Sequence, residues 1–165
     1  MSFRILPMLN RDLLRPEVQQ FIATHENEDE HKLLLRTKSV LGVPVQSIVT
    51  QISGRKKAKQ KLPSFYNAAD ILYPPGINIE QSSSELTARF KASLMQQIQP
   101  DMGHFIADLT GGFGADTWCF SHYFNKVHYV EPDTALLEIV CHNLKQLKSE
   151  NIMCHNSDAE DFLQK

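Results

Sequence analysis

The residue types that could do chemistry concentrate in a glycine-rich turn at residues 108–116. The apolar run 105–107 leads into Asp108, and Gly111, Gly112 and Gly114 follow before a segment of helical character. A strand, a glycine turn and a helix in this order form the first unit of a nucleotide-type cofactor site in an α/β sheet. Glycine at such a turn allows close approach of a ligand that a Cβ atom would hit.

Three acidic residues follow the ends of three successive predicted strands. Asp108 closes the first strand, Glu131 closes the second, and Asp158 comes after the third. Ligands of open parallel sheets bind beyond the carboxyl ends of the strands, so we expect these acids to face one crevice. Glu131 lies roughly 20 residues beyond the turn, the separation at which an acid binds ribose hydroxyls.

The acid directly before the turn indicates which kind of cofactor binds. Asp108 would face the pyrophosphate of a dinucleotide unfavourably, and Thr117 stands where a dinucleotide motif has its third glycine. A ligand with an ammonium or sulfonium group suits Asp108 better. We therefore expect S-adenosylmethionine (SAM); NAD or FAD, and a turn that serves packing alone, remain the alternatives.

The elements that must position these residues form two regions. Residues 1–75 have helical patterns, including one helix from Val45 through residue 61, and the breaker at 73–76 marks a boundary. Residues 76–165 contain strands at 105–109, 127–130 and 152–154, alternating with helices. This α/β alternation predicts the first three β-α units of a Rossmann-like parallel sheet.

The segment between the breaker and the sheet carries its own signals. Residues 77–80 alternate and predict a strand or extended arm, and Ser82 with Glu85 forms a capping box. The predicted helix behind it has an apolar face, formed by Leu86, Phe90, Leu94 and Ile98. Ser82 could cap this helix, bind an anion at its N-terminus, or do both.

The turn resembles motif I of class I SAM-dependent methyltransferases, over about residues 76–165. The resemblance implies that the turn binds the methionine part of SAM, with Asp108 near its amino group. It implies that Glu131 binds the ribose and that Asp158 and Ala159 flank the adenine. The cofactor-binding residues expected in the turn itself are Asp108, Thr110, Gly111, Gly112, Phe113 and Gly114.

A narrower resemblance links the chain to the N-terminal half of bacterial predicted RNA methyltransferases that carry a THUMP-like domain. It rests on ISGRKKA at 52–58, KLPSFY at 61–66 and EQSSSELTARFKA at 80–92. It implies that Gln81, Ser82, Ser83 and Thr87 lie near the methionine carboxylate.

These enzymes place their catalytic motif, an Asn or Asp followed by prolines, after a fourth strand, and the sequence ends at Lys165 without one. We therefore assign no catalytic residue and expect a fragment that is inactive alone. Without a fourth strand, the first strand would be an apolar sheet edge, which could be covered by a partner chain or by self-association.

A run of cations precedes the boundary. Its members are Arg55, Lys56, Lys57, Lys59 and Lys61, with no acid among them. This basic cluster could bind RNA phosphates, or it could be a solvated helix end. A non-catalytic RNA-binding module with a methyltransferase-like fold is therefore the alternative function.

Composition excludes other classes. The 165 residues carry a formal net charge of −2 and contain no apolar run long enough to span a membrane, and we expect a cytoplasmic protein. Cys119, Cys141 and Cys154 have no paired spacing, so we expect reduced thiols rather than a disulfide framework. The histidines are scattered, and we expect no metal site.

Overall fold

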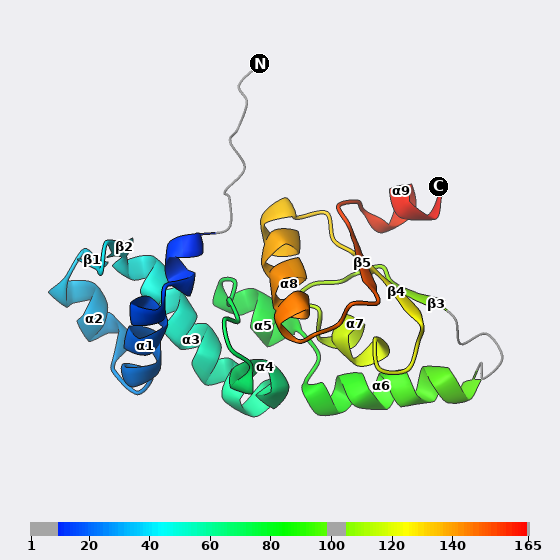
Figure 1. Cartoon of the computed structure of the whole chain (residues 1–165), viewed down its shortest axis with the longest axis horizontal. Helices are drawn as coiled ribbons and strands as arrows, with labels where there is room; N and C mark the ends of the chain where they lie inside the picture. The colour runs from blue at the N-terminus through cyan, green and yellow to red at the C-terminus, as the bar shows by residue number, and fades with distance from the viewer. Residues whose placement is uncertain (1–9, 99–104, 165) are drawn as a thin grey trace, which may run out of the picture.

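The computed structural model describes residues 10–98 and 105–164, so residues 1–9, 99–104 and 165 of the two predicted regions lie outside it. Figure 1 shows helices gathered at one end of an elongated molecule and a sheet with its helices at the other. The described helices are the 3-10 turn Arg11–Leu14, α1 Pro16–Thr24, α2 Glu30–Arg36, α3 Val45–Lys61, α4 Pro63–Asn67, α5 Gly76–Gln81, α6 Glu85–Ile98, α7 Ala115–Phe120, α8 Thr134–Gln146 and α9 Ala159–Leu163. The described strands are β1 Ser39–Val40, β2 Val43–Pro44, β3 Phe105–Asp108, β4 Lys126–Val130 and β5 Ile152–His155.

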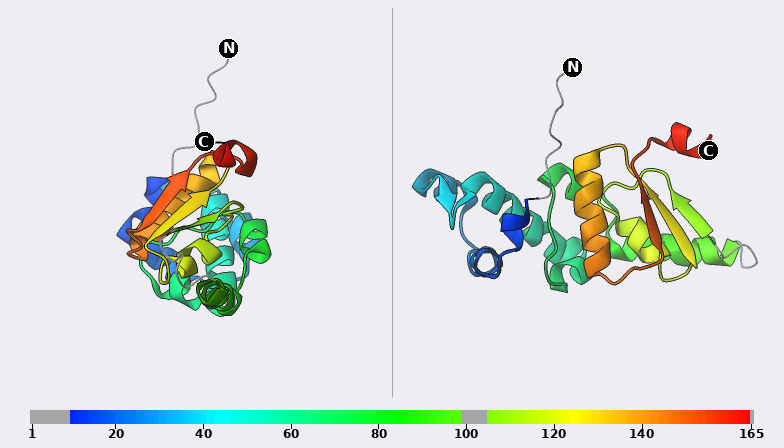
Figure 2. Two further views of the ribbon diagram at one scale, coloured as in Figure 1. Left: turned by 90° about the vertical axis from the view of Figure 1, so that its right-hand side faces the viewer. Right: turned by 45° about the horizontal axis from the view of Figure 1, so that its top comes forward.

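The sheet at the C-terminal end has the predicted topology. β3, β4 and β5 lie in that order and run parallel, with Ile106 paired to Val127 and Val127 paired in turn to Ile152. α7 connects β3 to β4, and α8 connects β4 to β5, as parallel strands require. The predicted α/β fold with the first units of a Rossmann-like sheet is confirmed (Figure 2).

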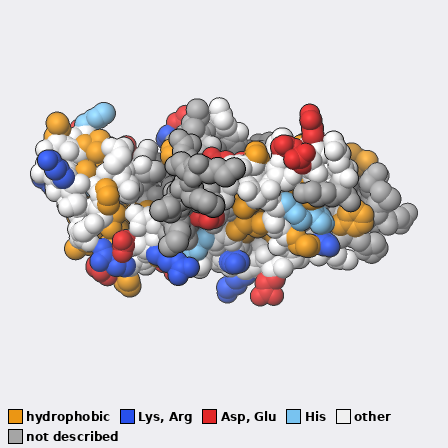
Figure 3. Space-filling view, turned by 90° about the horizontal axis from the view of Figure 1, so that it is seen from above, with side chains coloured by type: hydrophobic (Ala, Val, Ile, Leu, Met, Phe, Trp, Pro, Cys, Tyr) orange, Lys and Arg blue, Asp and Glu red, His pale blue; other side chains and the backbone are white. Residues whose placement is uncertain are grey.

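The two faces of this sheet differ in how they are covered. On one face, Val127 and Tyr129 of β4 are fully buried in a core shared with α7 and α8. Side chains alternate between the faces of a strand. On the other face, the ring of Phe162 in α9 lies 5.6 Å from that of His128, and Met153 is exposed. Figure 3 shows histidine and apolar side chains exposed side by side over the end of the molecule that holds the sheet.

β3 is an edge strand among the described residues, as the absence of a fourth strand predicts. Phe105 on this strand is 70% exposed, and the neighbouring helix α6 exposes Phe90 and Ile98. Parallel sheets are normally covered on both faces and flanked by further strands. Self-association through this edge stays a prediction.

Two apolar cores meet along α3. Ile48 and Ile52 belong to the core of the N-terminal helices, whereas Ala58 and the following Leu62 belong to the core that holds Tyr129 of the sheet. The helix extends through the basic run to Lys61, as predicted. The predicted boundary between residues 75 and 76 stays a prediction. Because α3 contributes to both cores, apolar packing continues from the N-terminal helices toward the sheet.

Two buried amides hold the extended segment between α4 and α5. Gln51 of α3 donates to the carbonyl of Tyr73 and accepts from its amide, both at 2.8 Å. Asn143 of α8 does the same for Leu72, at 2.8 and 2.9 Å. These four hydrogen bonds satisfy backbone groups that would otherwise be buried without partners, and they tie α3 to α8.

The segment before the sheet differs from its predictions. Residues 77–80 lie in α5 rather than in a strand, and this helix begins directly after Pro75. Ser82 closes its last turn by donating to the carbonyl of Ile79. The predicted capping box at Ser82 and Glu85 is also wrong. Ser84 caps α6 instead, since its Oγ accepts from the amide of Thr87 at 3.1 Å.

α6 turns its small residues inward. Ala88 and Ala92 are fully buried, whereas Leu86 and Phe90 of the predicted apolar face are 80% and 65% exposed. Small side chains allow α6 to lie close along α7, as Figure 1 shows. The predicted face therefore lies on the surface of the described part of the molecule.

The N-terminal helices are shorter than their apolar patterns. The apolar pattern of residues 13–22 is divided at Arg15, because a residue before a proline disfavours the helical conformation and α1 begins at Pro16. The apolar pattern of residues 31–40 continues past the end of α2 at Arg36, and a hairpin with Gly42 at φ +82° follows. None of the described helices is long and apolar enough to cross a membrane.

Candidate functional site

A cavity of about 340 Å³ lies between the glycine turn and the segment that joins α5 to α6. One wall is the turn itself, residues 110–114, continued by the first turn of α7. The opposite wall includes Asn78 and Gln81 of α5, then Ser82 and Ser83. The structure thus brings the predicted residues Thr110, Gly111, Gly112, Phe113, Gly114, Ser82 and Ser83 to one cavity.

Each glycine of the turn has its own physical reason. A Cβ at Gly111 would collide with the ring of Tyr129, and a Cβ at Gly114 would lie 2.6 Å from Val140. At Gly112, φ is +51° and a Cβ would meet only the carbonyl of Thr110, at 3.6 Å. Gly111 and Gly114 therefore let the turn pack on β4 and α8, whereas Gly112 has open space beside it for a ligand.

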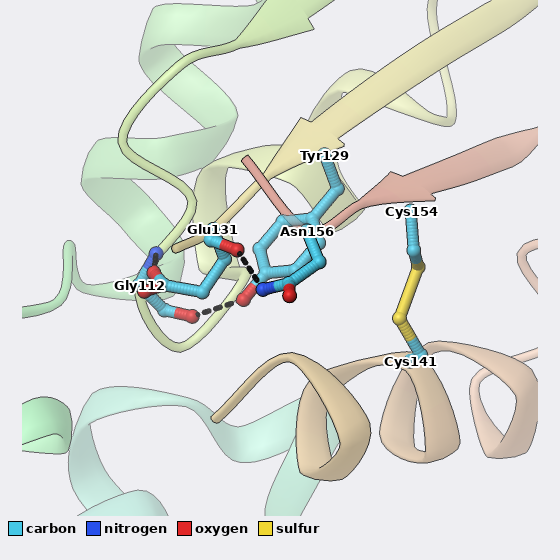
Figure 4. The surroundings of a disulfide bond; sticks show 6 residues. All are labelled: Gly112, Tyr129, Glu131, Cys141, Cys154 and Asn156. Atoms are coloured by element: carbon cyan, nitrogen blue, oxygen red, sulfur yellow. Dashed lines mark hydrogen bonds between the residues drawn. A yellow bond between two sulfur atoms is a disulfide. The ribbon is translucent and has the colours of Figure 1, made fainter. Parts of the chain in front are cut away.

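Tyr129 and Glu131 hold the turn through hydrogen bonds to Gly112 (Figure 4). The hydroxyl of Tyr129 donates to the carbonyl of Gly112 at 2.7 Å, and the amide of Gly112 donates to Oε2 of Glu131 at 3.0 Å. Burial raises the pKa of Tyr129, so the hydroxyl keeps the proton that it donates. Sequence reasoning missed Tyr129, whose apolar neighbours in the strand indicated packing alone.

Glu131 holds Gly112 and is itself held in place by hydrogen bonds. Its other oxygen accepts from the amide of Asp133 at 2.9 Å, and the side-chain amide of Asn156 donates to its carbonyl at 3.0 Å (Figure 4). A carboxylate can accept about four hydrogen bonds, so Glu131 keeps capacity for a ligand. Glu131 is buried and does not line the cavity, so its predicted contact with ribose stays a prediction.

Asp108 lies inside the turn and does not line the cavity. Its Oδ2 accepts from the hydroxyl of Thr117 at 2.7 Å, and its Oδ1 accepts from the amide of Thr110 at 3.3 Å. Burial raises the pKa of Asp108, and these two hydrogen bonds reduce the effect. Thr117, which replaces the third glycine of a dinucleotide motif, thus anchors the acid of the turn.

Asp158 and Ala159 lie at the start of α9. The Asp158 carboxylate accepts from the amide of Asp161 at 2.8 Å and is the N-cap of that helix, and Ala159 is its first residue. Neither residue lines the cavity. Their predicted contact with adenine stays a prediction.

Two charged residues of the cavity were missed by sequence reasoning. Lys91 of α6 and Asp116 of α7 line it beside Ser83. Lys91 lies within the motif at 80–92 and Asp116 ends the turn at 108–116, but neither was assigned a role. The two residues come from two helices that packing brings together, so no spacing in the sequence shows that they meet.

A disulfide joins Cys141 of α8 to Cys154 of β5, with their Cα atoms 6.6 Å apart (Figure 4). The expectation of reduced thiols is therefore wrong for this pair. The crossover between β4 and β5 brings the two residues together, and no sequence spacing reveals it. Cys119 is free and buried, as expected.

Part of the basic cluster surrounds a buried acid. Glu26 is 6% exposed, and its carboxylate accepts from Arg55 at 3.0 Å, from Lys59 at 3.3 Å and from the hydroxyl of Tyr66. The guanidinium of Arg55 also lies 4.4 Å from the centre of the Tyr66 ring. We call these four residues the Glu26 cluster.

The remaining cations of the basic cluster also have partners. Lys56 pairs with Glu30 at 3.1 Å, Lys57 pairs with Glu80, and Lys61 donates to the carbonyl of Glu80. The acids of other segments thus neutralise much of the charge that the sequence shows as an uninterrupted run.

No group of three or more His, Cys, Asp or Glu residues is placed to hold a metal ion within residues 10–98 and 105–164. His128 and His155 do meet, with ring nitrogens 2.9 Å apart, on the sheet face opposite Tyr129. Burial, with the charges of His155 and Lys126, lowers the pKa of His128, which favours its neutral form.

The fold defined by these elements, a Rossmann-like sheet with a glycine turn after its first strand, matches a solved structure. A protein from Porphyromonas gingivalis W83 described as a "putative methyltransferase" superposes with a TM-score of 0.71 at 21% sequence identity. The match covers 94% of this chain and 37% of that one, so the chain spans little more than a third of its structural neighbour. No family model and no curated protein matches the sequence. The likeness shows that the chain shares the fold of the matched part of that structure.

Proposed function

We propose that the cavity binds SAM and that the chain is the cofactor-binding portion of a SAM-dependent methyltransferase. The observation that carries the proposal is the cavity itself, which is bounded by the glycine turn on one side and by Ser82 and Ser83 on the other. The two segments lie about 30 residues apart in sequence and carry the two separate resemblances to methyltransferases.

The residues present fit such a cofactor. Gly112 offers open space on the cavity side of the turn, and Glu131 stands behind it with acceptor capacity for ribose hydroxyls. Asp158 and Ala159 would flank the adenine, beyond the end of β5. Asp108 would act through the shape of the turn, because it does not line the cavity and its carboxylate accepts from Thr110 and Thr117.

SAM supplies an electrophilic methyl group, which passes to a nucleophile in line with the departing thioether. The residues of this chain bind and orient the cofactor for that step. We assign no residue to activation of the methyl acceptor, and we expect the chain to be inactive without further polypeptide.

The charges of the cavity disfavour a dinucleotide. Lys91 and Asp116 are the charged residues that line it, and their charges cancel. The pyrophosphate of NAD or FAD is favoured by positive charge at a helix N-terminus, but the N-terminus of α7 at the cavity carries the acid Asp116. A zwitterionic amino acid end, as in SAM, needs no surplus of positive charge.

RNA is the proposed methyl acceptor, supported by the resemblance of residues 52–92 to predicted RNA methyltransferases. A second candidate function is RNA binding by the basic cluster without catalysis. Lys59 is favourable for it, because its side chain is 56% exposed despite its pairing with Glu26. Combined replacement of Lys56, Lys57 and Lys59 by neutral residues, followed by RNA filter binding, tests this candidate.

Calorimetry tests the main proposal on the chain as it is. The wild-type protein should bind SAM and its demethylated product S-adenosylhomocysteine, and should bind NAD at least tenfold more weakly, by roughly 1.4 kcal/mol. Binding of NAD as tight as that of SAM, or of no SAM-like ligand, would overturn it. RNA binding that depends on the three cations, without SAM affinity, would favour the second candidate.

A further inference from the structure

The cavity contains an ion pair that nothing in the sequence assigns to a function. We propose that Lys91 and Asp116, held together by Ser83, recognise the zwitterionic α-amino acid end of the ligand. Lys91 binds the carboxylate and Asp116 binds the ammonium. The inference rests on the proposed function, and it adds which charged side chains bind the amino acid end of SAM.

The three side chains form a closed set of contacts on the cavity wall. The ammonium of Lys91 donates to Oγ of Ser83 and to Oδ2 of Asp116, both at 2.8 Å. The hydroxyl of Ser83 donates to the same Oδ2, also at 2.8 Å. Ser83 lies between α5 and α6, Lys91 in α6 and Asp116 in the first turn of α7, so the set fixes three segments at one point.

Both charged groups keep hydrogen-bonding capacity. A lysine ammonium has three donors, and the described contacts of Lys91 use two of them. Its side chain is 46% exposed, so the third donor can reach a ligand in the cavity. Oδ1 of Asp116 is buried and has no partner among the described residues. The Asp116 side chain is 24% exposed and lines the cavity, so a ligand ammonium can approach the carboxylate from the cavity side.

An amino acid end is the natural complement of such a pair. Its ammonium and carboxylate are attached to one carbon atom, so the two opposite charges can lie antiparallel to those of Lys91 and Asp116. Each partner then gains a charge-assisted hydrogen bond, and no net charge is buried. A phosphate would gain from Lys91 but would be repelled by Asp116.

In this arrangement Asp116, rather than Asp108, binds the ammonium group of the ligand. The resemblance to methyltransferases places Asp108 near the amino group, but the Asp108 carboxylate is directed to Thr110 and Thr117. Asp116 lines the cavity, and Asp108 does not. The methionine end of the ligand therefore lies toward α6, and the adenosine lies toward Gly112 and Glu131.

Binding of three ligands to wild-type and variant chains tests the inference. S-adenosylhomocysteine carries both charged groups, its decarboxylated analogue keeps only the ammonium, and methylthioadenosine has neither. Lys91→Met should weaken S-adenosylhomocysteine binding by about ten- to hundredfold, the usual effect of losing a hydrogen bond to a charged group. The same substitution should leave the affinities for the other two ligands within about twofold.

Asp116→Asn should weaken binding of both ammonium-bearing ligands and leave methylthioadenosine binding unchanged. Lys56→Met is the matched control, because Lys56 is also an ion-paired lysine, bound to Glu30 at 3.1 Å, and does not line the cavity. This control should bind all three ligands as the wild type does. Unchanged methylthioadenosine affinity shows in each variant that the cavity is still folded.

The possible failures are distinguishable. Unchanged affinity of Lys91→Met for S-adenosylhomocysteine overturns the inference but not the proposed function, and so does an equal loss for all three ligands. A wild-type chain that binds none of the ligands overturns both.

Discussion

The molecule contains two clusters of opposite charges that differ in what surrounds them. In the Glu26 cluster, one buried carboxylate accepts from Arg55, Lys59 and Tyr66. In the cavity, Lys91 and Asp116 pair at 2.8 Å at the edge of an open space. The first cluster stands out in the sequence as a dense basic run, whereas the second cannot be seen there at all.

The difference teaches that charge density in a sequence is a poor guide to a binding site. The Glu26 cluster uses its charges internally, to join the end of α1 to α3 and α4. The cavity pair keeps a donor and an acceptor for a ligand. Spare hydrogen-bonding capacity beside a cavity, rather than the number of charges, distinguishes a binding site from a structural one.

Removal of the central acid should produce the largest effect on stability. Glu26→Ala should lower the free energy of unfolding by about 3 kcal/mol, because it leaves Arg55 without its carboxylate partner in a partly buried position. Glu30→Ala is the matched control, since Glu30 pairs only with the half-exposed Lys56 and should cost less than about 1 kcal/mol. Urea unfolding of both variants measures the difference, and equal losses would show that the Glu26 cluster has no special structural role.

The stability of the protein should also decline in acid through Glu26. Burial alone would raise the pKa of Glu26, but hydrogen bonds from Tyr66, Arg55 and Lys59 outweigh it and hold the pKa below the ordinary 4.5. The folded state therefore favours the carboxylate, so this stabilisation is complete above 4.5 and is lost as the pH falls through the lower folded value.

Urea midpoints of the wild type and Glu26→Gln, followed from neutral pH into acid, check this pH dependence. The gap in stability between the two proteins should shrink as the pH falls below 4.5. A gap that stays constant or widens in acid would contradict the assignment.

Loss of the cavity cation should have the smallest effect on stability. Lys91→Met should change the free energy of unfolding by less than about 1 kcal/mol, because the Lys91 side chain is 46% exposed and such pairs contribute little. A loss as large as that of Glu26→Ala would place Lys91 in the structural class and remove the contrast between the clusters.

Local signals predicted the parts of the fold that depend on local sequence. The strands around 105–108, 126–130 and 152–155 were recognisable as apolar runs, and the full length of α3 followed from side-chain pattern. The glycine turn was recognisable because residues 111 and 114 must be glycine for the turn to pack on Tyr129 and Val140.

The remaining features depend on contacts between distant segments. Asn143 holds Leu72 across 71 residues of sequence, and Cys141 meets Cys154 only through a crossover. The alternation of residues 77–80 resembles a strand, but these residues form the short helix α5, which begins directly after Pro75. The meeting of Lys91 and Asp116 also depends on packing of distant segments, because the alanines of α6 let this helix lie against α7.

The most direct test of the account follows amide NMR signals of the chain during titration with S-adenosylhomocysteine. The account predicts that the largest shifts occur at Gly112, Ser83 and Asp116, while Arg55 and Lys59 of the Glu26 cluster stay unchanged. Shifts centred on Arg55 and Lys59, or saturation with ligand without any change at Gly112 and Asp116, would contradict it.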